Sequence, residues 1–392
     1  MTKLEQLIKE LCPDGVEYRK LSEILNIQRG IRVVKNQLKD TGKYPVYQNS
    51  LTPMGYHTDS NFPANTAFII GAGAAGEVGY SDVDFWAADD CFCIVCQDDY
   101  NSRFLFHYLL SQQDFLLSKV RKASIPRLSR TVIENLKIPF PPLQVQSEIV
   151  RILDNFAELT AELTAELTAR KKQYEYYRDS LLTFDENISR VELQTAIKSL
   201  NTGLNPRQFF KLNTDDATNW YVTIREIQNN TVIFSEKTDR INNEALRLCN
   251  NRSNLEVGDV LFSGTGTIGE TAIIDKPPIN WNIKEGVYVI KPNQEKLNSR
   301  FLMYLLRTTQ VRTAIMKKVA GGTVKSIPMG EMRKLMIPLP TITEQETIVS
   351  LLDRFDTLCN DISEGLPAEI EGRRKQYEYY RDKLLTFKEK VN

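Results

Sequence analysis

The chain has 392 residues, enough for two ordinary domains and their connections. Its 50 basic residues balance its 50 acidic residues, which argues against a uniformly basic protein that coats nucleic acid. With only two histidines, a histidine-based metal site or catalytic triad is not expected. The six scattered cysteines form no disulfide framework, and no apolar run approaches the roughly 20 residues of a membrane span. We therefore expect a cytoplasmic protein that does not contact a membrane.

The first half begins with a globular part in which strands predominate. Apolar runs at 68–70 and 92–95 predict strands, and the amphipathic run 103–113 predicts a helix. The glycine pattern at 71–76 resembles a phosphate-binding loop, but strand-like sequence follows it where such a loop needs a helix. We interpret it as a turn between strands. Cysteines at 91, 93 and 96 alternate with apolar residues, which favours a buried strand over a zinc site.

A long helix follows the first globular part. Apolar residues from Ile149 to Phe184 recur at alternating spacings of four and three, which predicts a coiled-coil seam over about 36 residues. The tetrapeptide AELT occurs three times in tandem at 157–168. Because a short tandem repeat readily gains or loses a unit, we interpret this segment as an adjustable spacer within the helix.

The second half repeats this order. Strands are predicted at 221–224, 260–262 and 287–290, a second glycine turn at 264–269 and a helix at 300–310. A second heptad pattern starts at Ile348, and Gly365-Leu366-Pro367 predicts a kink or short turn within it. Two seams of similar length would pair most simply as an antiparallel coiled coil, with one globular domain at each end.

The internal duplication is the strongest signal in the sequence. The segments 170–184 and 373–387 agree at thirteen of fifteen positions. Shorter matches support the same duplication: NSRFL at 101–105 and 298–302, SIP at 124–126 and 326–328, and IPFP at 138–141 with IPLP at 337–340. The fold class is therefore α+β with an internal pseudo-two-fold repeat. We predict globular domains at 1–142 and 185–341, and helical regions at 143–184 and 342–392.

Local clusters of positive charge precede both helices. Lysine and arginine neutralise phosphates, and their similar placement in both halves suggests one extended polyanion that touches both domains. Polar residues of the loop after Tyr47 are suited to hydrogen bonding with base edges. The predicted DNA-binding residues are Gln48, Asn49, Ser50, Lys119, Arg121, Lys122, Arg127, Lys317, Lys318, Thr323 and Lys325.

The repeated helices also agree at positions that a coiled-coil seam does not need. Tyr176 and Arg178 correspond to Tyr379 and Arg381, and we expect all four on the outer face. Such identity suggests one type of partner that docks twice, although recent duplication leaves the same trace. No nucleophile–base pair or methyltransferase tetrad is present, so we predict no catalytic residue and no metal ligand in this chain.

These features together resemble the DNA-specificity subunit of type I restriction–modification systems. The likeness rests on the paired SIP, IPFP/IPLP and IVRILDNF/IVSLLDRF segments, the AELT run, the twin KQYEYYRD segments and the glycine turns, and it spans essentially the whole chain. The resemblance implies two target-recognition domains, each of which reads one half of a split, asymmetric site in double-stranded DNA. It also implies helices that dock two modification subunits, which carry S-adenosylmethionine, and restriction subunits, which use ATP and Mg²⁺. The chain itself would hold no cofactor.

Two alternatives come from other classes of protein. A fused restriction–methylation enzyme would need a methyltransferase domain, for which the sequence shows no motif. A coiled-coil adaptor without DNA contact would tolerate charge reversal of Lys317, Lys318 and Lys325, whereas a DNA reader would bind more weakly and with a weaker salt dependence.

Overall fold

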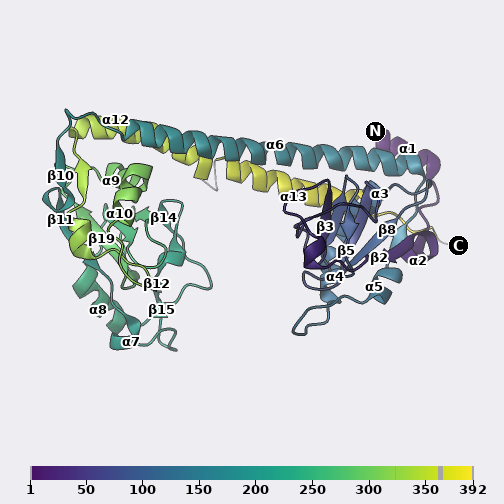
Figure 1. Cartoon of the computed structure of the whole chain (residues 1–392), viewed down its shortest axis with the longest axis horizontal. Helices are drawn as coiled ribbons and strands as arrows, with labels where there is room; N and C mark the ends of the chain where they lie inside the picture. Colours follow the sequence, from purple (N-terminus) through teal and green to yellow (C-terminus); the bar gives the residue numbers. More distant parts are fainter. Residues whose placement is uncertain (1, 323, 361–364, 391–392) are drawn as a thin grey trace. The chain divides into compact units, whose positions relative to one another are not determined.

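A computed structural model of the chain describes residues 2–322, 324–360 and 365–390, and Figure 1 shows its elements. The chain divides into two compact units. Unit 1 comprises Met1–Leu163 with Ile370–Asn392, and unit 2 comprises Thr164–Glu369. The predicted domain boundaries separate globular from helical segments and stay a prediction. None of the helices in the described ranges is both long enough and apolar enough to cross a membrane.

The globular part of unit 1 is built on an antiparallel sheet with the order β2-β8-β5-β6. A three-stranded sheet, β4-β3-β7, and the pair β1-β9 complete it. Its strands are β1 (Tyr18–Lys20), β2 (Asn26–Arg29), β3 (Tyr44–Tyr47), β4 (Tyr56–His57), β5 (Thr66–Ile70), β6 (Val78–Ser81), β7 (Trp86–Ala87), β8 (Cys91–Val95) and β9 (Lys137–Pro139). Its helices are α1 (Lys3–Leu11), α2 (Leu21–Ile24), η1 (Lys35–Gln37), α3 (Ser102–Ser111), α4 (Gln113–Ser118) and α5 (Arg130–Glu134).

Unit 2 repeats this plan with the sheet order β11-β19-β16-β17 and the three-stranded sheet β15-β12-β18. The pair β10-β20 corresponds to β1-β9, and β13-β14 forms a hairpin. Its strands are β10 (Arg190–Glu192), β11 (Ile197–Thr202), β12 (Asn219–Val222), β13 (Ile227–Gln228), β14 (Thr231–Val232), β15 (Arg240–Ile241), β16 (Val260–Ser263), β17 (Thr271–Ile273), β18 (Trp281–Ile283), β19 (Val287–Pro292) and β20 (Met336–Pro338). Its helices are η2 (Leu193–Thr195), α7 (Pro206–Phe209), η3 (Ile224–Glu226), α8 (Asn243–Ser253), α9 (Ser299–Arg307), α10 (Thr309–Met316) and α11 (Met329–Arg333).

The predicted strands and glycine turns are confirmed, with one difference. Each glycine turn joins two antiparallel strands, β5 to β6 in unit 1 and β16 to β17 in unit 2. Cys91 and Cys93 are buried in one apolar cluster, while Cys96 packs against another, as alternation along a strand requires. The strand predicted at 221–224 ends at Val222, because the Thr223 side chain caps the short helix η3 that follows.

Three helices carry the predicted seams: α6 (Leu143–Leu181), which contributes to both units, α12 (Ile342–Asn360) and α13 (Leu366–Leu384). In unit 1, the rings of Phe156 and Tyr380 stack with centroids 5.2 Å apart. In unit 2, Tyr177 of α6 stacks on Phe355 of α12 at 5.4 Å. As α6 advances from 156 to 177, its partners run back from 380 to 355, which is the predicted antiparallel pairing. The predicted interruption near 365–367 is also confirmed, since α13 begins at Leu366.

A buried glutamine joins each seam helix to its globular part. Gln146 Oε1 accepts a hydrogen bond of 2.7 Å from the backbone N–H of Asn101, and its Nε2 donates to Pro141 O at 2.8 Å. Gln345 makes the same two bonds in unit 2, to Asn298 at 2.8 Å and to Pro340 at 2.9 Å. The duplication thus preserves buried polar partners as well as apolar ones.

A buried polar network ties α13 to α3 in unit 1. The ring of His107 is 1% exposed, and its Nε2 lies 2.7 Å from Asp154 Oδ1. Its Nδ1 lies 2.9 Å from the hydroxyl of Tyr377. Burial lowers the pKa of His107, although hydrogen bonding to Asp154 opposes this shift. A neutral ring with its proton on Nε2 satisfies both contacts, because it donates to the carboxylate and accepts from the tyrosine.

The corresponding network in unit 2 has a different pairing. Tyr304 occupies the position of His107 on α9 and donates a hydrogen bond of 2.6 Å to Asp353. The hydroxyl of Tyr174, which corresponds to Tyr377, is buried and has no hydrogen-bond partner within the described part of the chain. The repeated tyrosine is therefore hydrogen-bonded in unit 1, whereas its equivalent in unit 2 has no such bond among the described residues.

Candidate nucleic-acid interface

Three segments that are distant in sequence meet in unit 1, and we call the region where they meet the corner of unit 1. The glycine turn (residues 71–76) lies between the loop after β3 and a short hairpin closed by Arg121 and Arg127. Gly73 N donates to Pro126 O at 3.1 Å, and Ala74 N donates to Asn49 O at 2.9 Å. A Cβ on Gly73, whose φ is +85°, would lie 2.8 Å from the Asn49 backbone oxygen. Glycine is therefore required for this close approach.

The hairpin itself, residues 121–127, is held by two backbone hydrogen bonds. Arg121 N donates to Arg127 O at 2.8 Å, and Arg127 N donates to Arg121 O at 3.2 Å. We call it the basic hairpin of unit 1. Arg127 also lines a small pocket of about 170 Å³ with Arg29, Asp89 and Asp90. The basic hairpin and the polar loop thus border the same glycine turn.

Unit 2 builds the same corner from a different sequence. Ala320 and Ser326 exchange two backbone hydrogen bonds of 2.8 Å and close the basic hairpin of unit 2, residues 320–326. Gly266 N of the glycine turn donates to Lys325 O at 2.9 Å. The polar loop of unit 1 has no counterpart against this turn within the described residues, since a Cβ on Gly266 would meet nothing within 4 Å.

This hydrogen-bond register corrects the match of the two SIP segments. Arg127 and Ser326 occupy equivalent places, because each bridges its glycine turn and closes its hairpin. Ser124 therefore does not correspond to Ser326. The two hairpins have the same length, so no insertion brings the two SIP segments into register. The identity between 124–126 and 326–328 is therefore accidental.

The predicted DNA-binding residues fall into two groups by accessibility. Lys119, Arg121, Lys122, Arg127, Lys317, Lys325 and Asn49 are exposed, and Gln48 and Ser50 are half-buried. Across the described ranges, no carboxylate pairs with Arg121, Lys122 or Arg127. Lys318 differs, because its Nζ bonds Glu331 at 2.8 Å within the unit. Thr323 lies outside the described residues.

The predicted docking residues also differ in their accessibility to solvent. Tyr176 is 70% exposed and Tyr379 is 62% exposed. The expectation that Arg178 is exposed is wrong: it is buried, pairs with Asp179 at 2.8 Å and lies over the ring of Tyr174. Arg381 is also largely covered, with 17% of its side chain exposed.

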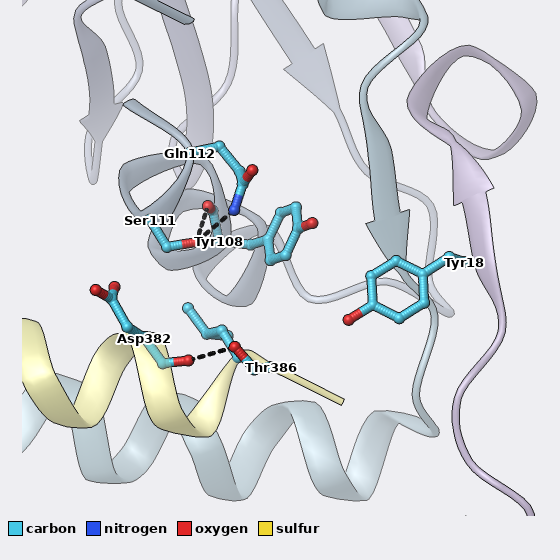
Figure 2. A pocket seen from close by; sticks show the side chains of 7 residues that line it. Tyr18, Tyr108, Ser111, Gln112, Asp382 and Thr386 are labelled. Carbon is cyan, nitrogen blue, oxygen red and sulfur yellow. Dashed lines mark hydrogen bonds between the residues drawn. The ribbon is translucent and has the colours of Figure 1, made fainter. Parts of the chain in front are cut away.

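The aspartate that follows each of these arginines faces the globular part of its unit. In unit 2, Asp179 accepts a hydrogen bond of 3.2 Å from Thr309 N at the start of α10. In unit 1, Asp382 and Thr386 line a pocket of about 170 Å³ that faces Gln112 and Tyr18, as Figure 2 shows. Arg178 and Asp179 are therefore held by contacts within unit 2, which periodicity alone does not distinguish from an external contact, whereas Asp382 of unit 1 keeps 61% of its side chain exposed.

Sequence reasoning missed the apolar residues beside the cations. Leu117, Ile125, Met316 and Val324 are all exposed to between 42% and 61%. They surround the same two corners as the basic residues. The signal that identifies them is exposure at matching positions, which appears only once the structural register of the two units is known.

The comparisons with known proteins agree with this architecture. The family model described as "Type I restriction modification DNA specificity domain" matches residues 13–170 and 197–372. A putative type I restriction enzyme specificity subunit of Haemophilus influenzae is 33% identical, with 98% of each chain covered. A type I restriction enzyme specificity subunit of Escherichia coli is 32% identical over 99% of this chain and 98% of the relative.

Solved structures share the fold at lower sequence identity. The crystal structure of a type I restriction–modification S subunit from M. genitalium superposes with a TM-score of 0.58 at 16% identity. It covers 95% of this chain and 96% of the other. A chain from a structural study of complex assembly in a type I system gives a TM-score of 0.55 at 16% identity, covering 95% and 97%. The chain belongs to the family of type I restriction–modification DNA specificity subunits.

Proposed function

We propose that this chain reads a bipartite, asymmetric site in double-stranded DNA and holds two modification subunits, with restriction subunits joining that core. Reading the DNA is recognition and not catalysis. S-adenosylmethionine, ATP and Mg²⁺ would then be bound by the partner subunits. The same corner built twice, with exposed cations beside a glycine turn, is the observation that supports DNA contact.

The proposal assigns one half-site to each unit. The corners share their backbone plan but differ in side chains, as Gln48–Ser50 of unit 1 has no counterpart at the described turn of unit 2. Two readers with different side chains are suited to two different half-sites, so the whole site should not be a palindrome. Exposed Tyr176 and Tyr379 are proposed docking residues for the modification subunits.

Genome-wide mapping of adenine methylation tests the proposal. In a host that expresses the chain with its modification subunit, we expect a split, non-palindromic motif methylated on both strands. The motif should vanish when the chain is omitted. Unchanged methylation with and without the chain, while the two proteins still co-purify, would instead identify an adaptor that does not contact DNA.

A charge series tests the interface directly. Arg121→Gln with Lys122→Gln should weaken binding to the mapped site and reduce the salt slope by about 0.9 for each phosphate that is no longer neutralised. Lys9→Gln with Lys20→Gln is the matched control, because these exposed lysines of unit 1 lie on other elements, α1 and β1. An affinity and salt slope that Arg121→Gln with Lys122→Gln leaves unchanged would place the cations of the basic hairpin outside the interface, and equal reductions in both pairs would show that the effect is not specific to the hairpin.

A further inference from the structure

The two basic hairpins end in tip loops of the same length and related pattern. The tip loop of unit 1 is residues 122–126, KASIP, and that of unit 2 is residues 321–325, GGTVK. The bonds that close each hairpin align Ile125 with Val324. Both tips thus carry a β-branched aliphatic residue at the equivalent place, although the other described positions differ.

The aliphatic residue of each tip is exposed to solvent. Ile125 is 53% exposed and Val324 is 61% exposed. A second matched pair stands on the preceding helices, with Leu117 42% exposed and Met316 49% exposed. Single exposed apolar residues are ordinary on a protein surface. Two matched pairs at equivalent places in diverged units are not explained by packing, because these side chains leave much of their surface in water.

The charge around the tips indicates what covers them. Ile125 is flanked in its hairpin by Arg121, Lys122 and Arg127, and Val324 precedes Lys325. A surface that combines apolar tips with exposed cations complements the phosphates and the base edges of a nucleic-acid groove. An apolar protein partner would not need the cations, so DNA is the occupant that both features favour.

We propose that Ile125 and Val324 enter a groove of the DNA and contact base edges in both half-sites, while residues that differ between the corners read the sequence. This inference rests on the proposed function and deepens it. Because the pattern is the same in both tips, it is suited to a feature that the half-sites share. The apolar tips would therefore add affinity without deciding which bases are preferred.

Ile125→Ser and Val324→Ser test this in the chain assembled with its modification subunits. The probe is a labelled duplex that carries the site mapped by methylation, with a scrambled duplex beside it. Removing an aliphatic side chain that DNA covers should weaken binding about fivefold in each variant. The salt slope should stay unchanged, because the cations that neutralise phosphates are kept, whereas Lys122→Gln should reduce it. The methylated motif should keep its sequence.

Two matched controls lie away from the corners. Val83 in unit 1 is 47% exposed, and Ile279 in unit 2 is 80% exposed. Val83→Ser and Ile279→Ser should bind the probe as the unchanged chain does. If the controls bind as weakly as the tip variants, the effect is a general reduction of surface apolarity and the proposal fails.

The remaining outcomes separate this inference from the proposed function. No preference of the unchanged chain for the mapped site over the scrambled duplex would overturn the proposed function, and the inference with it. A site preference that Ile125→Ser and Val324→Ser leave at full strength would overturn the inference alone. A tip variant that no longer co-purifies with the modification subunit would show that the tips contact protein, which also contradicts the inference.

Discussion

Substituting the two equivalent tyrosines of the repeated helix should affect the stability of the two units differently. Tyr377 lies 2.9 Å from His107 Nδ1, whereas Tyr174 is buried with no hydrogen-bond partner among the described residues. Tyr377→Phe removes a buried hydrogen bond and leaves the imidazole nitrogen unpaired, a cost of about 1–3 kcal/mol in the stability of unit 1. Tyr174→Phe removes an unpaired hydroxyl, so unit 2 should keep its stability or gain up to about 1 kcal/mol.

Hydrogen exchange followed by mass spectrometry is the appropriate assay. A single unfolding midpoint is not well defined for a chain of two units, and exchange reports each one separately. A destabilisation of about 2 kcal/mol corresponds to exchange roughly 30-fold faster in peptides from α3 and α13 for Tyr377→Phe. Peptides from α9 and α12 should show no acceleration for Tyr174→Phe. Equal acceleration in both variants would refute the assignment of different hydrogen-bond partners.

Three further predictions concern the titratable ring, the exposed tyrosines and the AELT run. Because burial lowers the pKa of His107, the unfolded chain binds more protons, so the stability of unit 1 should fall as pH drops below about 6.5. His107→Tyr, which copies Tyr304, should remove that part of the pH dependence from the protection of α3 and α13 against hydrogen exchange, once the intrinsic pH dependence of exchange is corrected for. Tyr176→Ala and Tyr379→Ala should each weaken binding of a modification subunit by about 2 kcal/mol, measured by calorimetry; unchanged affinity would place docking elsewhere. Adding one AELT unit to 157–168 lengthens α6 by about 6 Å, nearer the rise of two base pairs, but turns it by a net angle of about 40°, which matches one base pair; on the rotation, the DNA spacer should lengthen by about one base pair. Methylation mapping checks the last prediction, and an altered half-site would contradict it.

Many individual strands, helices and turns were predictable from the sequence, because short stretches of residues specify them. Short apolar runs predicted β5, β8, β16 and β19, and the absence of a helix after each glycine pattern predicted a turn. Heptad spacing predicted α6, and Gly365-Leu366-Pro367 predicted the interruption before α13. Strand and helix periodicity depend on residues that are close together in sequence, so each element can be recognised from its own segment.

The candidate site itself was only partly predictable. The cations of the basic hairpin were identified by their type, but the correspondence of Arg127 with Ser326 is set by hydrogen bonds to the glycine turns. Those bonds join residues 55 positions apart in unit 1 (Ala72 and Arg127) and 61 positions apart in unit 2 (Thr265 and Ser326), and short identities such as SIP do not report them. The exposed tips at Ile125 and Val324 became comparable only when that register was known.

The sequence by itself determined the duplication, the α+β class, the antiparallel seams and the turns. Tertiary structure alone decided which repeated residues are available: Tyr176 and Tyr379 are exposed, whereas Arg178 is buried. It also decided that Tyr377 has a partner and Tyr174 has none among the described residues. The reason is that helical periodicity specifies a face, while burial and hydrogen bonding depend on what another segment, distant in sequence, places against that face.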